Sequence, residues 1–402
     1  MQSPGNISNC IAGADMMDLE SLGDGRVEKT KSGQPIFILD SCEKNPIVKP
    51  RDIGLTWYEN GELKIGAVFN GGAEYIDDRV ILLPRCQRNY KKGKFFDEKL
   101  GRERDCPENY TSEIWPLTSR DGVNFSRFQN VTICGDGTEH QDFAHGIEDI
   151  RIIKYENSCM LIGCGKTKPA FKGSNADRIA VYSTEDFLNI TYQGMVEPFD
   201  SRNAVPFPTP VNGNLYTLLR FHPNIHIGLL QSGIEQLLNP AEHKDQWEEI
   251  YKQKNGNLLL EVGLFPHEKE KIGPGPQLIK TDRGWLLLYH AVGEIEIEIC
   301  KAYGLSRKIE RGYSISAAIL DPDDPRKVIR RARRPIYIPS AAYELYGDHE
   351  YPVDVPAVVF PVGAFALQDK LLIYAGAGDK YIILLSCELE KLVDYLWEHG
   401  EL

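Results

Sequence analysis

Residues 146–163 read GIEDIRIIKYENSCMLIG and carry the clearest fold signal in the chain. Two largely apolar runs, Asp149–Tyr155 and Cys159–Gly163, flank a short polar turn. Such a pattern is typical of a β-hairpin. Alternation along the first run places Asp149 and Arg151 on one face of its strand. A carboxylate beside a guanidinium suits a polar pocket, although an ion pair at a strand edge on the surface gives the same pattern.

The hairpin recurs along the chain. Its further copies are Gly66–Tyr75 with Val80–Pro84, Val205–Val211 with Leu215–Phe221, Pro276–Lys280 with Trp285–His290, and Ala357–Leu367 with Leu371–Ala375. A third strand follows most hairpins, at Ile179–Ser183, Ile225–Gln231, Tyr313–Leu320 and Tyr381–Ser386. Repeated units of three or four antiparallel strands are typical of propeller blades. The sequence therefore predicts an all-β, five-bladed β-propeller with a short C-terminal helix; a β-sandwich or two stacked all-β domains fit the strand pattern equally well.

The ends of the chain and two charged stretches depart from this repeated strand pattern. Residues 1–44 are polar and are expected to form a lead-in to a single catalytic domain at 45–402. The apolar spacing in Glu388–Glu398 predicts an amphipathic helix packed on the outside of the propeller. Arg88–Asn109 and Gly293–Arg311 are rich in charge and are expected to be long loops at blade ends, serving as lids or as contacts in a homo-oligomer.

Composition narrows the class of protein. The net charge of −12 argues against a partner that is nucleic acid or an anionic membrane. No apolar run approaches the roughly 20 residues that span a bilayer, and Met1–Asp18 lacks a secretory pattern. The nine cysteines form no C-x-x-C pairs, which favours reduced thiols, a cytoplasmic protein and no metal site.

In a propeller, the natural place for chemistry is the mouth of the central channel. Polar residues fall near inner strands in every unit: Asn70, Arg85, Asp149, Arg151, Arg202, Asn203, Arg220, Lys271, His290 and Asp379. A cation that ends an apolar strand usually marks only the place where the strand reaches water. Several such cations in successive units favour a site for an anion.

The motifs that surround these residues resemble a known family. They are Phe69-Asn70-Gly71-Gly72-Ala73, Leu83-Pro84-Arg85, Gly146-Ile147-Glu148-Asp149-Ile150-Arg151, Lys271-Ile272-Gly273-Pro274-Gly275-Pro276, Gly284-Trp285-Leu286-Leu287-Leu288-Tyr289-His290, Leu320-Asp321-Pro322-Asp323-Asp324-Pro325 and Tyr374-Ala375-Gly376-Ala377-Gly378-Asp379. Their order and spacing are similar to glycoside hydrolase family 130, the β-mannoside phosphorylases and related β-mannosidases, which are five-bladed propellers. The resemblance runs from about Asn45 to Tyr395.

The resemblance implies a role for each site residue. Asp149 corresponds to the single catalytic acid, which passes its proton to the glycosidic oxygen through a hydroxyl of the bound mannose. The residues implied to hold inorganic phosphate are Arg85, Arg202, Arg220 and His290. The residues implied to contact sugar are Asn70, Lys271, Tyr313 and Asp379, and we expect Arg151 to bind substrate beside Asp149. Phosphate is then a co-substrate, and neither a metal nor another cofactor is expected.

The chemistry of these residue types agrees with the implied roles. An inverting hydrolase needs a second carboxylate to activate water. A phosphorylase needs one proton donor and a cationic cradle, because phosphate is already an anionic nucleophile. The sequence thus predicts an inverting phosphorylase that converts mannosyl-glucose or a manno-oligosaccharide to mannose 1-phosphate. An inverting β-mannosidase on the same fold and a non-catalytic propeller that binds glycans stay open as alternatives.

Several positions depart from the family pattern. Ile150 follows the acid where Pro is common, Gly71 also replaces a common Pro, Leu219 stands where His is frequent, and Ala375 where a second Tyr is usual. The stretch Pro276-Gln277-Leu278 replaces a Pro-Pro-Ile pattern. With the two charged stretches, these departures bear on the subsite for the leaving group more than on the phosphate and mannose sites.

Overall fold

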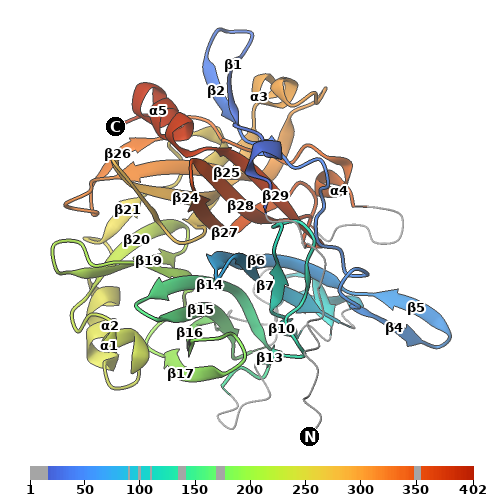
Figure 1. Ribbon diagram of the computed structural model, residues 1–402, viewed down its shortest axis with the longest axis vertical. Helices are drawn as coiled ribbons and strands as arrows, with labels where there is room; N and C mark the ends of the chain where they lie inside the picture. The colour runs from blue at the N-terminus through green and yellow to red at the C-terminus, as the bar shows by residue number, and fades with distance from the viewer. Residues whose placement is uncertain are drawn as a thin grey trace, which may run out of the picture.

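The computed structural model describes residues 17–88, 91–97, 101–108, 111–134, 142–168, 177–347 and 355–402. Within these residues, five antiparallel sheets follow one another in chain order around a common centre (Figure 1). The predicted five-bladed β-propeller is therefore confirmed.

Each blade runs outward from an inner strand. The first blade contains β6 (Ala67–Ile76), β7 (Arg79–Gln87), β10 (Ser112–Ile114), β11 (Leu117–Ser119), β12 (Ser126–Arg127) and β13 (Ile133–Cys134). The second contains β14 (Ile147–Tyr155), β15 (Ser158–Lys166), β16 (Asp177–Thr184) and β17 (Ile190–Val196). The third contains β18 (Arg202–Pro206), β19 (Leu215–Phe221), β20 (Asn224–Leu230) and β21 (Leu258–Leu260). The fourth contains β22 (Lys271–Pro274), β23 (Ile279–Thr281), β24 (Gly284–Ile295), β25 (Ile309–Leu320) and β26 (Val328–Arg331).

The fifth blade joins the two ends of the chain. Its strands are β27 (Val359–Leu367), β28 (Lys370–Ala377), β29 (Tyr381–Glu388) and the N-terminal β3 (Asp40–Ser41), which pairs with β29. The segment before Asn45 therefore contributes to the propeller, where a lead-in was expected. It also carries η1 (Leu19–Ser21) and the hairpin of β1 (Arg26–Lys29) and β2 (Pro35–Ile38). The buried run Ile36–Leu39 explains why this segment packs.

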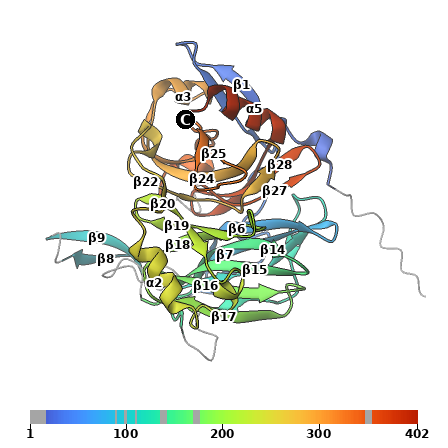
Figure 2. The same cartoon turned by 90° about the vertical axis from the view of Figure 1, so that its left-hand side faces the viewer.

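The two stretches expected to be long loops have regular structure, so that prediction was wrong. The first forms a projecting hairpin of β8 (Lys91–Asp97) and β9 (Arg102–Glu108), as Figure 2 shows. It lacks the apolar alternation of a half-buried strand, which hid it from pattern reading. In the second, β24 and β25 pair as far as Ile295 and Ile309, and α3 (Ile297–Ala302) lies between them. Another hairpin, β4 (Thr56–Glu59) and β5 (Glu62–Ile65), precedes the first blade.

The remaining helices lie in connections between strands, except for the last, which follows the final strand of the fifth blade. They are α1 (Glu235–Leu238), α2 (Lys244–Lys252), η2 (Pro266–Glu268), α4 (Ala342–Leu345) and α5 (Leu389–His399). As predicted, α5 is amphipathic and packs outside the propeller, with Leu392 and Leu396 buried against Phe37 and the fifth blade. Seven cysteines in the described ranges are free thiols. No helix in the part of the chain that the structure describes is long and apolar enough to cross a membrane.

Apolar side chains fill the spaces between blades. One cluster joins the second, third and fourth blades, and others join the fourth to the fifth, the fifth to the first and the first to the second. Inner strands contact one another from β27 through β6, β14 and β18 to β22, and β27 also contacts β24 and β25 of the fourth blade. The approach is tight: an added Cβ at Gly72 would lie 2.3 Å from the carbonyl oxygen of Ile150. This packing fixes the positions of the polar side chains that project from the inner strands.

Candidate active site

The same β-bulge occurs in the inner strands of the first three blades. The pairing register shifts by one residue between Phe69 and Gly72, between Glu148 and Arg151, and between Arg202 and Val205. At the centre of each bulge stands Asn70, Asp149 or Asn203, with φ of 50°, 52° and 60°. Asn and Asp tolerate this left-handed conformation better than most residues. A bulge re-aims a side chain, and here it turns three polar side chains out of the inner strands.

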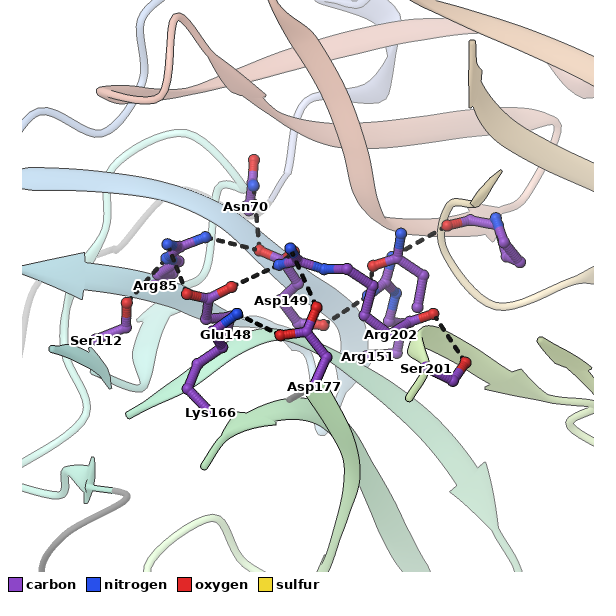
Figure 3. Close-up of polar contacts among 12 residues, drawn as sticks. Asn70, Arg85, Ser112, Glu148, Asp149, Arg151, Lys166, Asp177, Ser201 and Arg202 are labelled. Atoms are coloured by element: carbon purple, nitrogen blue, oxygen red, sulfur yellow. Dashed lines mark hydrogen bonds and ion pairs between the residues drawn. The ribbon is translucent and has the colours of Figure 1, made fainter. Parts of the chain in front are cut away.

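Asp149 is a buried carboxylate held by three neighbours (Figure 3). Asn70 donates from Nδ2 to Oδ1 of Asp149 at 3.1 Å, and Arg202 donates from Nη2 to Oδ2 at 3.2 Å. Nη1 of Arg85 lies 3.6 Å from Oδ1. Burial raises the pKa of Asp149, but the charges of Arg202, Arg85 and Arg151 and the hydrogen bond from Asn70 outweigh burial and leave that pKa lowered. The free site therefore favours the ionised carboxylate.

Glu148 connects the same two arginines. Its Oε1 accepts from Arg85 at 2.9 Å, and its Oε2 accepts from Arg202. Arg85 also donates from Nε to Ser112 at 3.0 Å and stacks over the ring of Phe69. Because Glu148 is fully buried, both arginines are fixed next to Asp149 instead of reaching into solvent.

Arg220 and His290 adjoin this group of arginines. Arg220 lies directly opposite Arg202 in the pairing of β18 with β19. An added Cβ at Gly273 would lie 2.4 Å from Cε1 of His290 and 2.7 Å from Cδ of Arg220. Only glycine at position 273 leaves room for these two side chains, which both pack against it. Nε of Arg220 and both ring nitrogens of His290 are buried without a hydrogen-bond partner among the described residues.

The environment keeps His290 neutral. Burial, followed by the charges of Arg220, Lys271, Arg151 and Arg202, holds the pKa of His290 well below its usual range. Its ring stacks on Phe360 at 4.3 Å between centroids. Burial and the charge of Arg202 also lower the pKa of Arg220 to about 10. The neutral imidazole of His290 offers an uncharged N–H donor, and the neighbouring cations offer charged donors. Together they suit the binding of an anion.

Lys271 and Tyr313 lie beside His290 in the fourth blade. Lys271 and Tyr313 both pair with Val292, from opposite sides of β24. Nζ of Lys271 lies 4.8 Å from the centroid of Tyr313, and burial lowers the pKa of this amine. Asp379 lies in the turn between β28 and β29, half-buried and with φ of 53°. Gly376, which precedes this turn, packs directly against Asn70, so the turn borders the Asn70 side of the site.

Arg151 has a different environment from the one expected for a residue that binds substrate. Its side chain is fully buried, and its guanidinium donates to the carbonyl oxygens of Asp149, Pro274 and Gly275 and to Oδ1 of Asn203, at 2.7–3.2 Å. The bulge interrupts the alternation on which the shared face with Asp149 was based. Arg151 thus ties the second, third and fourth blades together beneath the acid.

Sequence reasoning assigned no role to Glu148, Lys166 or Asp177, and it listed Asn203 near an inner strand without a specific role. The matching positions of Asn70, Asp149 and Asn203 in successive inner strands are a signal that could have given Asn203 one. Lys166 and Asp177 form an ion pair at the paired ends of β15 and β16, and Asp177 lies 3.7 Å from Arg202. No local pattern marks that pair. The described residues contain no cluster of His, Cys, Asp and Glu suited to a metal ion.

Fold and site together define a propeller enzyme in which a buried carboxylic acid group adjoins a cluster of arginines. A family model described as β-1,4-mannooligosaccharide phosphorylase matches residues 43–398. The chain belongs to that family, glycoside hydrolase family 130, and is a β-mannoside phosphorylase.

Individual relatives agree with this assignment. A β-1,2-mannobiose phosphorylase of Thermoanaerobacter is 28% identical over 367 residues, which cover 89% of this chain and 99% of the relative. A β-1,4-mannooligosaccharide phosphorylase of Ruminococcus albus is 31% identical over 205 residues, 50% of this chain and 52% of the relative. The solved β-1,2-mannobiose phosphorylase of Listeria innocua has the same fold, with a TM-score of 0.62, 21% identity and coverage of 90% of this chain and 99% of the other.

Proposed function

We propose that this enzyme cleaves a β-mannoside by inverting phosphorolysis. A phosphate oxygen attacks C1 of the mannose while the bond from C1 to the glycosidic oxygen breaks. Asp149 supplies the proton that the leaving oxygen takes up, relayed through a hydroxyl of the mannose. The products are α-mannose 1-phosphate and the sugar released from it. The observation that carries this proposal is the direct contact of the Asp149 carboxylate with Arg85 and Arg202.

The contacts of the nearby carboxylates support phosphate over water as the nucleophile. An inverting hydrolase needs a second carboxylate that can take a proton from water. Glu148 is held by Arg85 and Arg202, and Asp177 by Lys166 and Arg202. Each of these carboxylates therefore already lies in ion pairs with two cations. Phosphate needs no such base, because it enters as an anion.

Phosphate would also create the conditions in which Asp149 acts as an acid. In the free site the arginines stabilise the ionised carboxylate and hold its pKa low. A phosphate dianion that binds Arg85 and Arg202 offsets their positive charge, and a like charge nearby disfavours ionisation of a carboxyl group. Asp149 then takes up a proton more readily, as a general acid requires.

The positions of the other site residues assign them either to phosphate or to the sugar. We assign phosphate contacts to Arg85, Arg202, Arg220 and His290. Arg220 pairs with Arg202 across the strands, and the side chains of Arg220 and His290, which have unpartnered buried nitrogens, both pack against Gly273. We assign sugar contacts to Asn70, Lys271, Tyr313 and Asp379. The cation–aromatic pair of Lys271 and Tyr313 provides a hydrogen-bonding and stacking wall of the kind that sugars use.

The substrate is proposed to be mannosyl-glucose or a manno-oligosaccharide. The test is to incubate the enzyme with β-1,2-mannobiose, β-1,4-mannobiose and mannosyl-glucose, each with and without phosphate. We expect mannose 1-phosphate from at least one substrate, and only when phosphate is present. Release of free mannose at the same rate without phosphate would contradict the proposal.

A further inference from the structure

The ion pair of Lys166 and Asp177 lies outside the set of residues to which the reaction gives a role. Asp177 begins β16 and faces Lys166, the last residue of β15. Both side chains are buried, with 4% and 8% of their surface exposed. Two charges removed from water incur a desolvation cost that their mutual attraction often fails to exceed. A pair retained at such a cost suggests a role other than stability.

Asp177 reaches Arg202 with its second oxygen. Oδ1 of Asp177 accepts from Nζ of Lys166, and Oδ2 lies 3.7 Å from Nη1 of Arg202. Arg202 uses its other terminal nitrogen, Nη2, for Glu148 and Asp149. The guanidinium is therefore held from both terminal nitrogens, one toward the acid and one toward the pair, as Figure 3 shows.

The backbones of the pair are tied to the same two site residues. The backbone N–H of Lys166 donates to the carbonyl of Gly146, two residues before Glu148, at 2.9 Å. The backbone N–H of Ser201, directly before Arg202, donates to the carbonyl of Asp177 at 3.1 Å. The pair thus links the segment that carries the acid to the segment that carries the arginine.

We propose that Asp177, fixed by Lys166, is a positioning residue that aims Arg202 at the phosphate. The proposal rests on the proposed function, because it takes Arg202 as a phosphate ligand. Groups that orient a binding side chain from behind typically contribute roughly 10–100-fold to affinity or activity, a scale known best for partners of metal ligands.

If Asp177 and Lys166 acted only through their charges, replacing each of them would change phosphate affinity in opposite directions. Replacement of Asp177 by Asn removes a negative charge and would strengthen phosphate binding through the field alone. Replacement of Lys166 by Met removes a positive charge and would weaken it. If orientation of Arg202 dominates, both replacements weaken phosphate binding, because each leaves the guanidinium less constrained.

The decisive variant carries Lys166→Met and Asp177→Asn together. It preserves the net charge and leaves no lone buried ion, so it is the form best suited to fold. The matched control is Asp200→Asn, which breaks the exposed ion pair of Asp200 with Arg178, the residue next to Asp177. Phosphate affinity is measured by calorimetry, which needs no turnover, and KM for phosphate and for the mannoside is measured in parallel.

We expect the double variant to weaken phosphate binding about tenfold or more, with a matching rise in KM for phosphate and little change in KM for the mannoside. The Asp200→Asn control should match the wild type. Unchanged phosphate affinity in a folded double variant, or tighter binding in Asp177→Asn, would overturn the positioning role while leaving phosphorolysis intact. If the wild-type enzyme itself bound no phosphate, the proposed function would fail, and the positioning role with it.

Discussion

Nη2 of Arg202 lies 3.2 Å from Oδ2 of Asp149 and also contacts Glu148, so one guanidinium nitrogen connects the acid to the cationic side of the site. This contact couples the charge state of the acid to whatever binds the arginine.

Replacement of Asp149 by Asn should abolish turnover while sugar binding persists. The amide keeps the shape of the side chain and the contact with Asn70 but cannot deliver a proton. General acid catalysis typically contributes about 10²–10⁴-fold, and we expect kcat to fall by at least that range. Titration of the variant with the mannoside by calorimetry should give an affinity near that of the wild type. Unaltered kcat would show that another group is the acid.

Single replacements of Arg85, Arg202 and Arg220 by Ala should raise KM for phosphate more than KM for the mannoside. A hydrogen bond to a charged group contributes about 1.5–3 kcal/mol, which corresponds to a rise in KM of roughly 10–150-fold. Arg326→Ala is the matched control, because that arginine is exposed and pairs with Asp324 at the periphery. A larger effect on the sugar than on phosphate would move these arginines out of the phosphate site.

Arg151→Ala should affect stability before it affects substrate affinity. The change leaves buried carbonyl oxygens of Pro274 and Gly275 and the side chain of Asn203 without their donor. We expect the free energy of unfolding to fall by about 3–5 kcal/mol, measured by urea denaturation. A variant of normal stability with a raised KM for the mannoside would return Arg151 to a role in substrate binding.

The alkaline limb of the pH profile should respond to the charge of residue 202. A cation near a carboxyl group lowers its pKa, so Arg202→Met should raise the pKa of Asp149. Activity that requires the protonated acid is lost as pH rises through that pKa. The descending limb of kcat/KM for the mannoside should therefore move to higher pH in Arg202→Met, whatever the maximal value of kcat/KM for that variant. Arg202→Lys keeps the charge, and its limb should stay near that of the wild type.

The fold was predictable because each blade has a recognisable pattern in its local sequence. Hairpins such as β14–β15 and β27–β28 consist of apolar runs joined by short polar turns, and the number of such hairpins gave the number of blades. The charged hairpin of β8 and β9 was missed, because strands without an apolar face give no period-two signal. The strand β3 was missed because two residues are too short to form a pattern.

Part of the site's arrangement could be predicted, but its detailed geometry could not. Arg85 and Arg220 stood out at the ends of apolar strands, and the resemblance added Arg202 and His290 as expected phosphate ligands. In the structure Arg85 and Arg202 contact Asp149, Arg220 pairs with Arg202, and His290 lies with Arg220 against Gly273. The bulge at Asp149 reverses the alternation from which the place of Arg151 was inferred, and a one-residue insertion cannot be seen without the partner strand. Lys166 and Asp177 meet only through cross-strand pairing, which sequence spacing does not reveal.

The most direct test of phosphorolysis at this site is to follow the anomeric product by ³¹P and ¹H NMR during reaction of the enzyme with a β-mannobiose and phosphate. We predict α-mannose 1-phosphate as the first sugar phosphate formed, in an amount equal to the released sugar, and no product when phosphate is omitted. Formation of the β-anomer first, or release of free mannose that does not depend on phosphate, would contradict attack by phosphate on C1 opposite the leaving oxygen.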